Sequence, residues 1–305
     1  MLQTEIFDMR LLELIDINQT PAIPVDKCEF SEGPIWNPVG NYLTFTDTRN
    51  GGRTYRWSQE KGFSVIRSYA NAVNGEAYDS FGRILQCEHY THRVIRVNDN
   101  MTGYEVMASH YKGKELNSPN DVIVKKSNGS IYFTDPHFGR RPSGCGIAGH
   151  MPQPVQGVYR IDPVSKEIEL ITDEVYEPNG LAFSPDEKTI YVADTERKEI
   201  AVFDVNEKGN LCNKRTFPKT EDYGCDSGLP DGLCVDIEGN IYLAAQGGIH
   251  VYTEAGEYLG IIAMPKTVGN LCFGGKNMKS LFVCCSNMLI ILSTKVEGAR
   301  IGIGC

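Results

Sequence analysis

The sequence lacks any apolar run that approaches the roughly 20 residues of a membrane-spanning helix. The amino end is not a secretory signal either, because Asp8, Arg10, Glu13 and Asp16 interrupt it. Basic residues are not in excess: 30 Lys and Arg against 39 Asp and Glu give a net charge of −9. This balance disfavours nucleic acids and anionic membranes as partners. We therefore expect a cytoplasmic protein that acts on a small molecule.

Several catalytic motifs are also missing. The sequence contains no H-E-x-x-H, no P-loop and no G-x-S-x-G. A G-x-G-x-x-G match at 144–149 follows no apolar strand and is followed by Pro152 and Pro154, so a dinucleotide site is excluded. The ten cysteines include four inside apolar, strand-like runs: Cys234, Cys272, Cys284 and Cys285. Buried free thiols in a reducing compartment are the expected state.

What the sequence does contain is a repeat. Six stretches share a polar residue, a short apolar strand, a turn and a second apolar strand, and their starts lie 42, 46, 59, 52 and 39 residues apart. They read EGPIWNPVGNYLTFTD from Glu32, NGEAYDSFGRILQCEH from Asn74, NDVIVKKSNGSIYFTD from Asn120, NGLAFSPDEKTIYVAD from Asn179, DGLCVDIEGNIYLAAQ from Asp231 and NLCFGGKNMKSLFVCC from Asn270. Further strands are indicated at 157–162, 167–172 and 200–205. Four strands in each copy of such a repeat are typical of a β-propeller blade.

The sequence therefore predicts an all-β fold, a six-bladed β-propeller that forms one domain over residues 1–305, with a core of about 28–293. We expect the segment 1–27 to close the last blade, with a strand around Leu11–Ile17. A propeller is complete by itself, so a monomer is the expected state.

Each repeat begins with a side chain that carries an oxygen. The first strand of a blade lines the central channel, so six such side chains would encircle one end of it. Asn or Asp before Gly is also a turn signal, but that alternative does not explain Glu32 or the Pro119–Asn120 pair. Oxygen ligands without His or Cys suit a hard divalent cation on the axis, and Glu32 and Asp231 would neutralise its charge. We name Glu32, Asn74, Asn120, Asn179, Asp231 and Asn270 the oxygen ring.

The second strands of four repeats end on an acid. These strand-end acids are Asp47, Glu88, Asp135 and Asp194. We expect them to accept backbone N–H bonds between blades. His89 and His137 follow two of them and are either structural or in contact with a substrate. The loop 136–157, rich in Gly and Pro, is long enough to predict a lid over the metal end.

These motifs, among them SEGPIW, LNSPNDVIV, GSIYFTDPHFG, PNGLAFSPDEKTIYVADT and PDGLCVDIEGNIY, resemble one known family from about residue 28 to 293. It is the family of calcium-dependent gluconolactonases and SMP-30-like (regucalcin-like) six-bladed propellers, and the likeness is greater to its microbial sugar-lactone hydrolases than to its animal members. The resemblance implies one cation on the axis, Ca²⁺ or another divalent ion such as Mg²⁺, Mn²⁺ or Zn²⁺. Its implied ligands are Glu32, Asn179 and Asp231, with Asn120 as a ligand or a substrate contact.

The sequence departs from the animal-type pattern at one place. The animal proteins carry an Arg two residues before the position of Asn120, where this chain has Ser118. We therefore expect other residues to bind substrate hydroxyls. The candidates are Asn117, His89 and His137, with Asn74 of the ring.

The reaction that this pattern predicts is hydrolysis of a sugar lactone to an aldonic acid. The cation would activate the lactone carbonyl as a Lewis acid, and a carboxylate would assist the attacking water as general base. Asp231 is the first candidate for this base and Glu32 the second. Two alternatives stay open: a related hydrolase of phosphotriesters or aromatic esters, and a non-catalytic metal-binding propeller that binds a partner on its rim.

Overall fold

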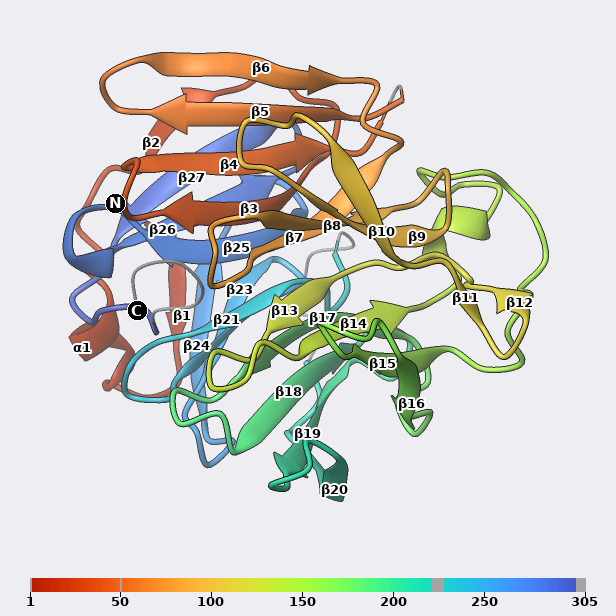
Figure 1. The fold of residues 1–305 in the computed structure, drawn as a ribbon. Helices are drawn as coiled ribbons and strands as arrows, with labels where there is room; N and C mark the ends of the chain where they lie inside the picture. Colours follow the sequence, from red (N-terminus) through yellow and green to blue (C-terminus); the bar gives the residue numbers. More distant parts are fainter. Residues whose placement is uncertain (1, 50, 221–227, 300–305) are drawn as a thin grey trace.

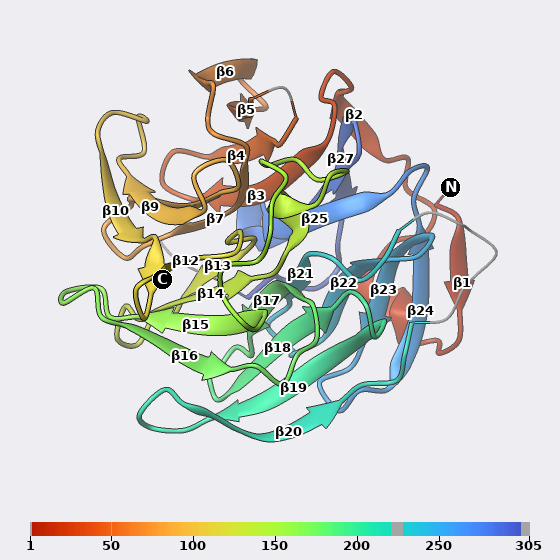
Figure 2. The ribbon, with the colours of Figure 1, turned by 90° about the vertical axis from the view of Figure 1, so that its right-hand side faces the viewer.

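The computed structural model describes residues 2–49, 51–220 and 228–299, and these form the all-β, six-bladed propeller that the repeats predict. Six antiparallel sheets stand around a common axis, which Figure 1 shows from the side and Figure 2 from one end. The sheets follow one another in chain order, so we number the blades 1 to 6. Inner strands of successive blades contact each other, and β25 of blade 6 contacts β3 of blade 1, which closes the circle.

Each blade runs from an inner strand at the axis to an outer strand at the rim. Blade 1 contains β3 (Ser31–Asn37), β4 (Tyr42–Asp47), β5 (Arg53–Ser58) and β6 (Gly62–Ser68), and blade 2 contains β7 (Val73–Tyr78), β8 (Ile84–Glu88), β9 (Arg93–Val97) and β10 (Tyr104–Ala108). Blade 3 contains β13 (Val122–Val124), β14 (Ile131–Asp135), β15 (Gly157–Ile161) and β16 (Ile168–Thr172), and blade 4 contains β17 (Pro178–Phe183), β18 (Thr189–Asp194), β19 (Glu199–Val205) and β20 (Leu211–Thr216). Blade 5 contains β21 (Leu233–Val235), β22 (Ile241–Ala245), β23 (Gly248–Tyr252) and β24 (Tyr258–Ala263), and blade 6 contains β25 (Val268–Gly274), β26 (Ser280–Cys285) and β27 (Met288–Ser293).

The chain start completes the last two blades. The strand β2 (Ala22–Val25) pairs with β27 as the outer strand of blade 6, and β1 (Thr4–Ile6) adds a fifth strand to blade 5 through β24. The prediction of a strand around Leu11–Ile17 is wrong. Leu11–Leu14 form the short helix α1, because a helical turn lets Leu11 and Leu14 face the core together, and both are buried.

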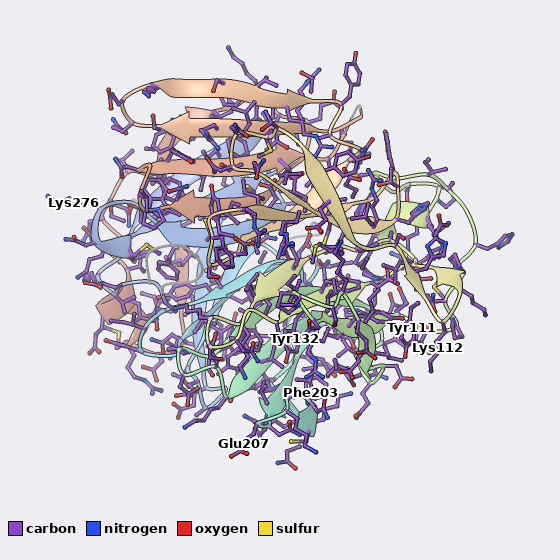
Figure 3. The ribbon with its side chains drawn as sticks, viewed as in Figure 1. Tyr111, Lys112, Tyr132, Phe203, Glu207 and Lys276 are labelled. Atoms are coloured by element: carbon purple, nitrogen blue, oxygen red, sulfur yellow. The ribbon has the colours of Figure 1, made fainter. Side chains whose placement is uncertain are left out.

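The core lies between neighbouring blades. Both faces of a blade are covered, so the inner hairpins read as nearly continuous apolar runs rather than as an alternation. Between blades 3 and 4, Tyr132 and Phe203 are fully buried, and Tyr132 packs edge-on against Phe183 with ring centroids 5.2 Å apart. In Figure 3 Tyr132 and Phe203 lie inside the sheets, whereas Glu207 lies at the periphery.

Three short elements stand between the main strands: the hairpin of β11 (His110–Tyr111) and β12 (Lys114–Glu115), and the 3₁₀ helices η1 (Phe138–Arg140) and η2 (Lys276–Met278). No helix among the described residues is long and apolar enough to cross a membrane. The eight cysteines of the described ranges are free thiols. Cys234, Cys284 and Cys285 are buried as predicted, and Cys272 is half-buried.

Candidate functional site

The structure places the oxygen ring at one end of the six inner strands. Four of its members lie within β3, β7, β17 and β25, and Asn120 and Asp231 lie just before β13 and β21. All but one are at least nine-tenths buried, with exposures of 2% for Glu32 and 4–8% for the four asparagines. Asp231 is the exception and is half-buried. Of the two ring carboxylates, Asp231 is therefore the more accessible.

Glycines that follow ring residues let neighbouring blades approach closely. A Cβ at Gly75 would lie 2.7 Å from the carbonyl oxygen of Asn120, and a Cβ at Gly180 would lie 2.5 Å from that of Asp231. The N–H groups of these glycines donate to the same two oxygens, at 2.8 and 3.2 Å. Neither glycine has a positive φ. The turn alternative therefore fails for the Asn–Gly pairs, which lie in strands where only a residue without a side chain fits.

The contact between blades 6 and 1 closes the ring. A Cβ at Gly269 would lie 2.5 Å from Oε1 of Glu32, and one at Gly232 would lie 2.2 Å from the side chain of Asn270. Members of the ring that lie far apart in the sequence are thus neighbours in space.

Asp121 is a carboxylate that the sequence analysis did not select. It follows Asn120 where four of the other five blades have Gly, and its Oδ1 accepts the N–H of Val122 at 2.9 Å. Burial raises the pKa of Asp121 to about 7, although hydrogen bonds from the N–H groups of Val122 and Leu181 oppose the rise. The signal in the sequence that could have identified Asp121 was an acidic residue directly after the ring residue, where most blades have Gly.

The ring brings acidic groups close together in a buried place. Burial raises the pKa of Glu32 to about 8; the N–H of Gly33 lowers it, and the nearby Asp121 raises it further. Burial, Glu32 and Asp121 together hold the pKa of Asp231 well above its usual range. In the described part of the chain, no Lys, Arg or His forms an ion pair with these three carboxylates.

These residues fit a hard divalent cation. Glu32, Asp231, Asn120 and Asn179 offer carboxylate and carboxamide oxygens, which Ca²⁺ prefers. Within the described ranges, no three His, Cys, Asp or Glu side chains gather closely enough to hold a metal, so carboxamides must complete the site. Thr195 supports one of them: Nδ2 of Asn179 donates to its Oγ1 at 3.1 Å, which leaves the amide oxygen of Asn179 available.

Three strand-end acids accept backbone N–H groups, but from the segment that leads into their own blade and not from a neighbouring blade as expected. Asp47 accepts the N–H groups of residues 29 and 30, at 3.0 Å each. Asp135 accepts those of residues 117 and 118, and Asp194 those of residues 176 and 177. In each case the donors lie three and two residues before the ring residue. These acids therefore fix the backbone that positions Glu32, Asn120 and Asn179.

Glu88 differs from the other three acids because its partners are side chains. Its oxygens accept from Arg67 (3.0 Å), Asn71 (3.0 Å), Thr91 (2.5 Å) and Arg93 (2.6 Å), and its side chain is fully buried. Burial would raise the pKa of Glu88, but hydrogen bonds from Thr91, Asn71 and Arg93 outweigh it and lower the pKa.

The loop 136–157 is firmly attached and reaches three other blades. Oγ1 of Thr48 in blade 1 donates to Sγ of Cys145 at 3.2 Å, and Arg141 forms an ion pair with the buried Glu177 in blade 4. A Cβ at Gly139 would lie 2.9 Å from the ring of His89 in blade 2. The loop thus spans the ring end of the channel, which is the arrangement expected of a lid.

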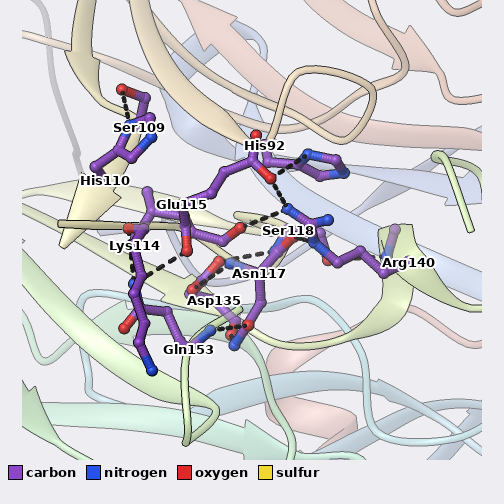
Figure 4. A network of polar contacts seen from close by, with 12 residues as sticks. His92, Ser109, His110, Lys114, Glu115, Asn117, Ser118, Asp135, Arg140 and Gln153 are labelled. Atoms are coloured by element: carbon purple, nitrogen blue, oxygen red, sulfur yellow. Dashed lines mark hydrogen bonds and ion pairs between the residues drawn. The ribbon is translucent and has the colours of Figure 1, made fainter. Parts of the chain in front are cut away.

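Asn117 anchors this loop. Figure 4 shows it at the centre of a network with Asp135, Arg140 and Gln153. Its Nδ2 donates to the carbonyl oxygens of Asp135 (3.2 Å) and Val155 (2.9 Å), and its Oδ1 accepts the N–H of Gln153 (3.1 Å). Asn117 is fully buried, and both amide atoms are engaged, so the substrate contact predicted for it finds no support.

The two histidines occupy different environments. His89 is 2% exposed, and its Nε2 lies 3.5 Å from Nδ2 of the ring residue Asn74. Burial and the neighbouring His92 lower the pKa of His89 to about 4, so it is neutral at neutral pH. His137 is half-buried in the lid, and its Nε2 lies 3.1 Å from the carbonyl oxygen of Gly149. Of the two, only His89 contacts the ring.

A cavity lies on the side of the ring that faces the opposite end of the propeller. It measures about 320 Å³ and extends from Gly33, Asp121 and Asn270 to the turns around Asn41 and Lys276 at the opposite face. In Figure 3 Lys276 and Lys112 lie at opposite ends of the molecule. The cavity contains no histidine or ring carboxylate in its lining, so the candidate reaction site remains the ring end beneath the lid.

Comparison with known proteins identifies the family of the chain. The profile of the family described as SMP-30/Gluconolactonase/LRE-like region matches residues 30–287. A gluconolactonase of Zymomonas mobilis is 31% identical over 96% of this chain and 86% of its own, and bovine regucalcin is 27% identical over 86% and 84%. The solved structure of a gluconolactonase from Xanthomonas campestris superposes with a TM-score of 0.86 at 32% identity, over 95% of this chain and 94% of that one. The chain belongs to the SMP-30/gluconolactonase family, as its motifs predicted.

Proposed function

We propose that this protein is a lactonase that opens sugar lactones to aldonic acids at the oxygen ring. The observation that carries the proposal is the convergence of two carboxylates and two carboxamides from four different blades. None of these carboxylates has a cationic partner in the described part of the chain. Relatives named gluconolactonase match nearly the whole chain, which supports this substrate class.

Glu32, Asn120, Asn179 and Asp231 would hold the divalent cation, with Ca²⁺ the ion that best suits their oxygens. When bound, such an ion polarises a carbonyl oxygen and stabilises the negative charge that develops on it. The side chains of the protein supply the general base and the groups that position the substrate. No covalent intermediate is required, in keeping with the absence of a nucleophile motif.

Asp231 is the general base in this proposal. It is half-buried, whereas Glu32 is 2% exposed and one of its oxygens accepts the N–H of Gly33 at 2.9 Å. Asp231 can therefore meet a water molecule beside the ring and take its proton as the water attacks the lactone carbonyl. Glu32 serves mainly as a charge that the cation neutralises.

The lid and the neighbouring side chains supply the rest of the site. The loop 136–157 limits the access of bulk water, and Asn74 and His89 offer polar atoms on one side of the ring. Thr195 holds the amide of Asn179 in one orientation.

A pH-indicator assay with a panel of aldonolactones tests the proposal. The metal-free protein, prepared with a chelator, is assayed alone and with added Ca²⁺, Mg²⁺, Mn²⁺ or Zn²⁺. We expect activity on at least one aldonolactone that is lost with the chelator and restored by a divalent ion. Turnover of a phosphotriester but of no lactone would favour the related hydrolase instead. Inactivity on every ester would favour the non-catalytic propeller.

A further inference from the structure

Several buried side chains have polar atoms without a hydrogen-bond partner in the described part of the chain, and two of them, His89 and Gln246, directly follow the second strand of a blade. His89 and Gln246 are each 2% exposed. The Nδ1 atom of His89 has no partner, and neither Nε2 nor Oε1 of Gln246 has one. Buried polar atoms in proteins are nearly always paired, so atoms like these indicate a partner outside the protein, such as water or a ligand. The sequence analysis did not select Gln246.

His89 and Gln246 occupy equivalent positions in their blades. The N–H of Asp231 donates to the carbonyl oxygen of Ala244 at 2.9 Å. Blade 3 has the equivalent bond, in which the N–H of the ring residue donates to the carbonyl oxygen of the residue before the strand-end acid. Ala245 therefore takes the place of a strand-end acid in blade 5. Gln246 follows it, as His89 follows the acid of blade 2.

In two blades the side chain at this position contacts the ring residue of the same blade, whereas Thr48 in blade 1 and Ser286 in blade 6 bond elsewhere. In blade 2, His89 lies 3.5 Å from the amide of Asn74, and in blade 4, Oγ1 of Thr195 accepts from the amide of Asn179 at 3.1 Å. Since the register is the same in blade 5, Gln246 stands next to the ring residue of that blade. In blade 5 the polar group at this place, the amide of Gln246, has no hydrogen-bond partner among the described residues.

The circular order of the blades puts these two residues on opposite sides of the axis. Blades 2 and 5 are separated by blades 3 and 4 in one direction and by blades 6 and 1 in the other. A ligand centred on the oxygen ring therefore has His89 on one flank and Gln246 on the other.

We propose that Gln246 and His89 determine specificity by binding hydroxyl groups on the two flanks of a polyhydroxylated lactone, with Gln246 taking a vicinal diol. A carboxamide can donate to one hydroxyl and accept from its neighbour, and a neutral imidazole has one donor and one acceptor nitrogen. These donor and acceptor atoms can bind substrate hydroxyl groups without the Arg side chain that the animal-type proteins carry at the position of Ser118. The inference rests on the proposed function, because it names the part of the substrate that this site recognises.

The test compares a lactone that has hydroxyl groups with one that has none. In the Gln246→Met variant, which keeps the side-chain length, kcat/KM for D-glucono-1,5-lactone should fall about 10- to 100-fold, as expected for a lost pair of buried hydrogen bonds. The value for δ-valerolactone should stay within about twofold, because this substrate has no hydroxyl to lose. The melting temperature should not fall, since the replaced amide bonds to no group in the described part of the chain. An equal loss on both lactones, or a marked drop in melting temperature, would overturn the inference.

Gln86→Met provides the matched control. Gln86 is fully buried, and its amide donates to Glu76 at 2.5 Å and accepts from Arg67 at 2.6 Å, away from the ring. This variant should lose thermal stability and keep the same preference between the two lactones.

Gluconate binding, measured by calorimetry, separates this inference from the proposed function. If the wild type opens no lactone, the proposed function fails. A loss of about tenfold in gluconate affinity in Gln246→Met would still support the role of Gln246, and an unchanged affinity would reject it.

Discussion

The strand-end acids and the ring carboxylates are the same residue types at the same end of the propeller, yet their surroundings are opposite. Asp135 and Asp194 each accept backbone N–H groups, and Glu88 accepts from four side chains. Glu32 and Asp231 lie against other carboxylates and have no cationic partner among the described residues.

This difference separates stability from function. A buried carboxylate whose oxygens are all satisfied stabilises the fold, and removing it leaves its donors unpaired. Carboxylates crowded together without counter-charge are destabilising unless a ligand neutralises them, which is the usual condition of a binding site. Substitutions at the two sets should therefore change different quantities: catalysis at the ring, and stability at the strand ends.

The largest effect is expected for Asp231→Asn. We expect kcat/KM for a reactive aldonolactone to fall by about 10²- to 10⁴-fold, the usual contribution of a general base. The melting temperature of the metal-free protein should not fall, because the change removes repulsion from Glu32 and Asp121. Steady-state kinetics and thermal unfolding measure the two effects. A variant that binds metal normally and keeps full activity would rule out Asp231 as the base.

Glu88→Gln should be the most destabilising of the strand-end changes. Removing the charge leaves Arg67 and Arg93 without their counter-ion, and we expect a loss of about 3 kcal/mol in the free energy of unfolding at pH 7. Urea unfolding measures this loss. Activity per folded molecule should change little.

The effect of Glu88→Gln on stability should depend on pH. The pKa of Glu88 is lower in the folded protein than in the unfolded chain, so its stabilisation is complete above the unfolded value of 4.5 and declines as the pH falls through the folded value. The stability difference between wild type and Glu88→Gln should therefore shrink below about pH 4.5. A difference that is constant down to pH 2 would contradict the role assigned to the ionised carboxylate.

Asp194→Asn should have the smallest effect of the three. It keeps the shape of the side chain but turns one acceptor toward the N–H groups of Tyr176 and Glu177 into a donor, so we expect a loss of about 1–3 kcal/mol in unfolding free energy. The kcat of the folded fraction should be nearly unchanged. Chemical unfolding and single-turnover kinetics test this, and a loss of activity as large as that of Asp231→Asn would break the distinction between the two sets.

Much of the fold could be predicted from the sequence because a propeller repeats one local plan. The inner hairpins, such as β17 and β18, carry long apolar runs with a turn between them, and their polar first residues mark the channel end. The chain start was harder. Whether Leu11–Leu14 or Ala22–Val25 completes the last blade depends on which segment meets the edge of β27, and short segments carry little periodicity.

The sequence by itself determined the number of blades and the residues of the oxygen ring, because hydrophobic periodicity and the repeated polar position are local properties of the chain. Only the tertiary structure decided which acids are satisfied, that Asn117 holds the lid, that Asp121 is buried near Glu32 and Asp231, and that the amide of Gln246 has no partner among the described residues. The physical reason is that the pairing of a buried polar group depends on neighbours brought from other blades, and these neighbours are far away in the sequence.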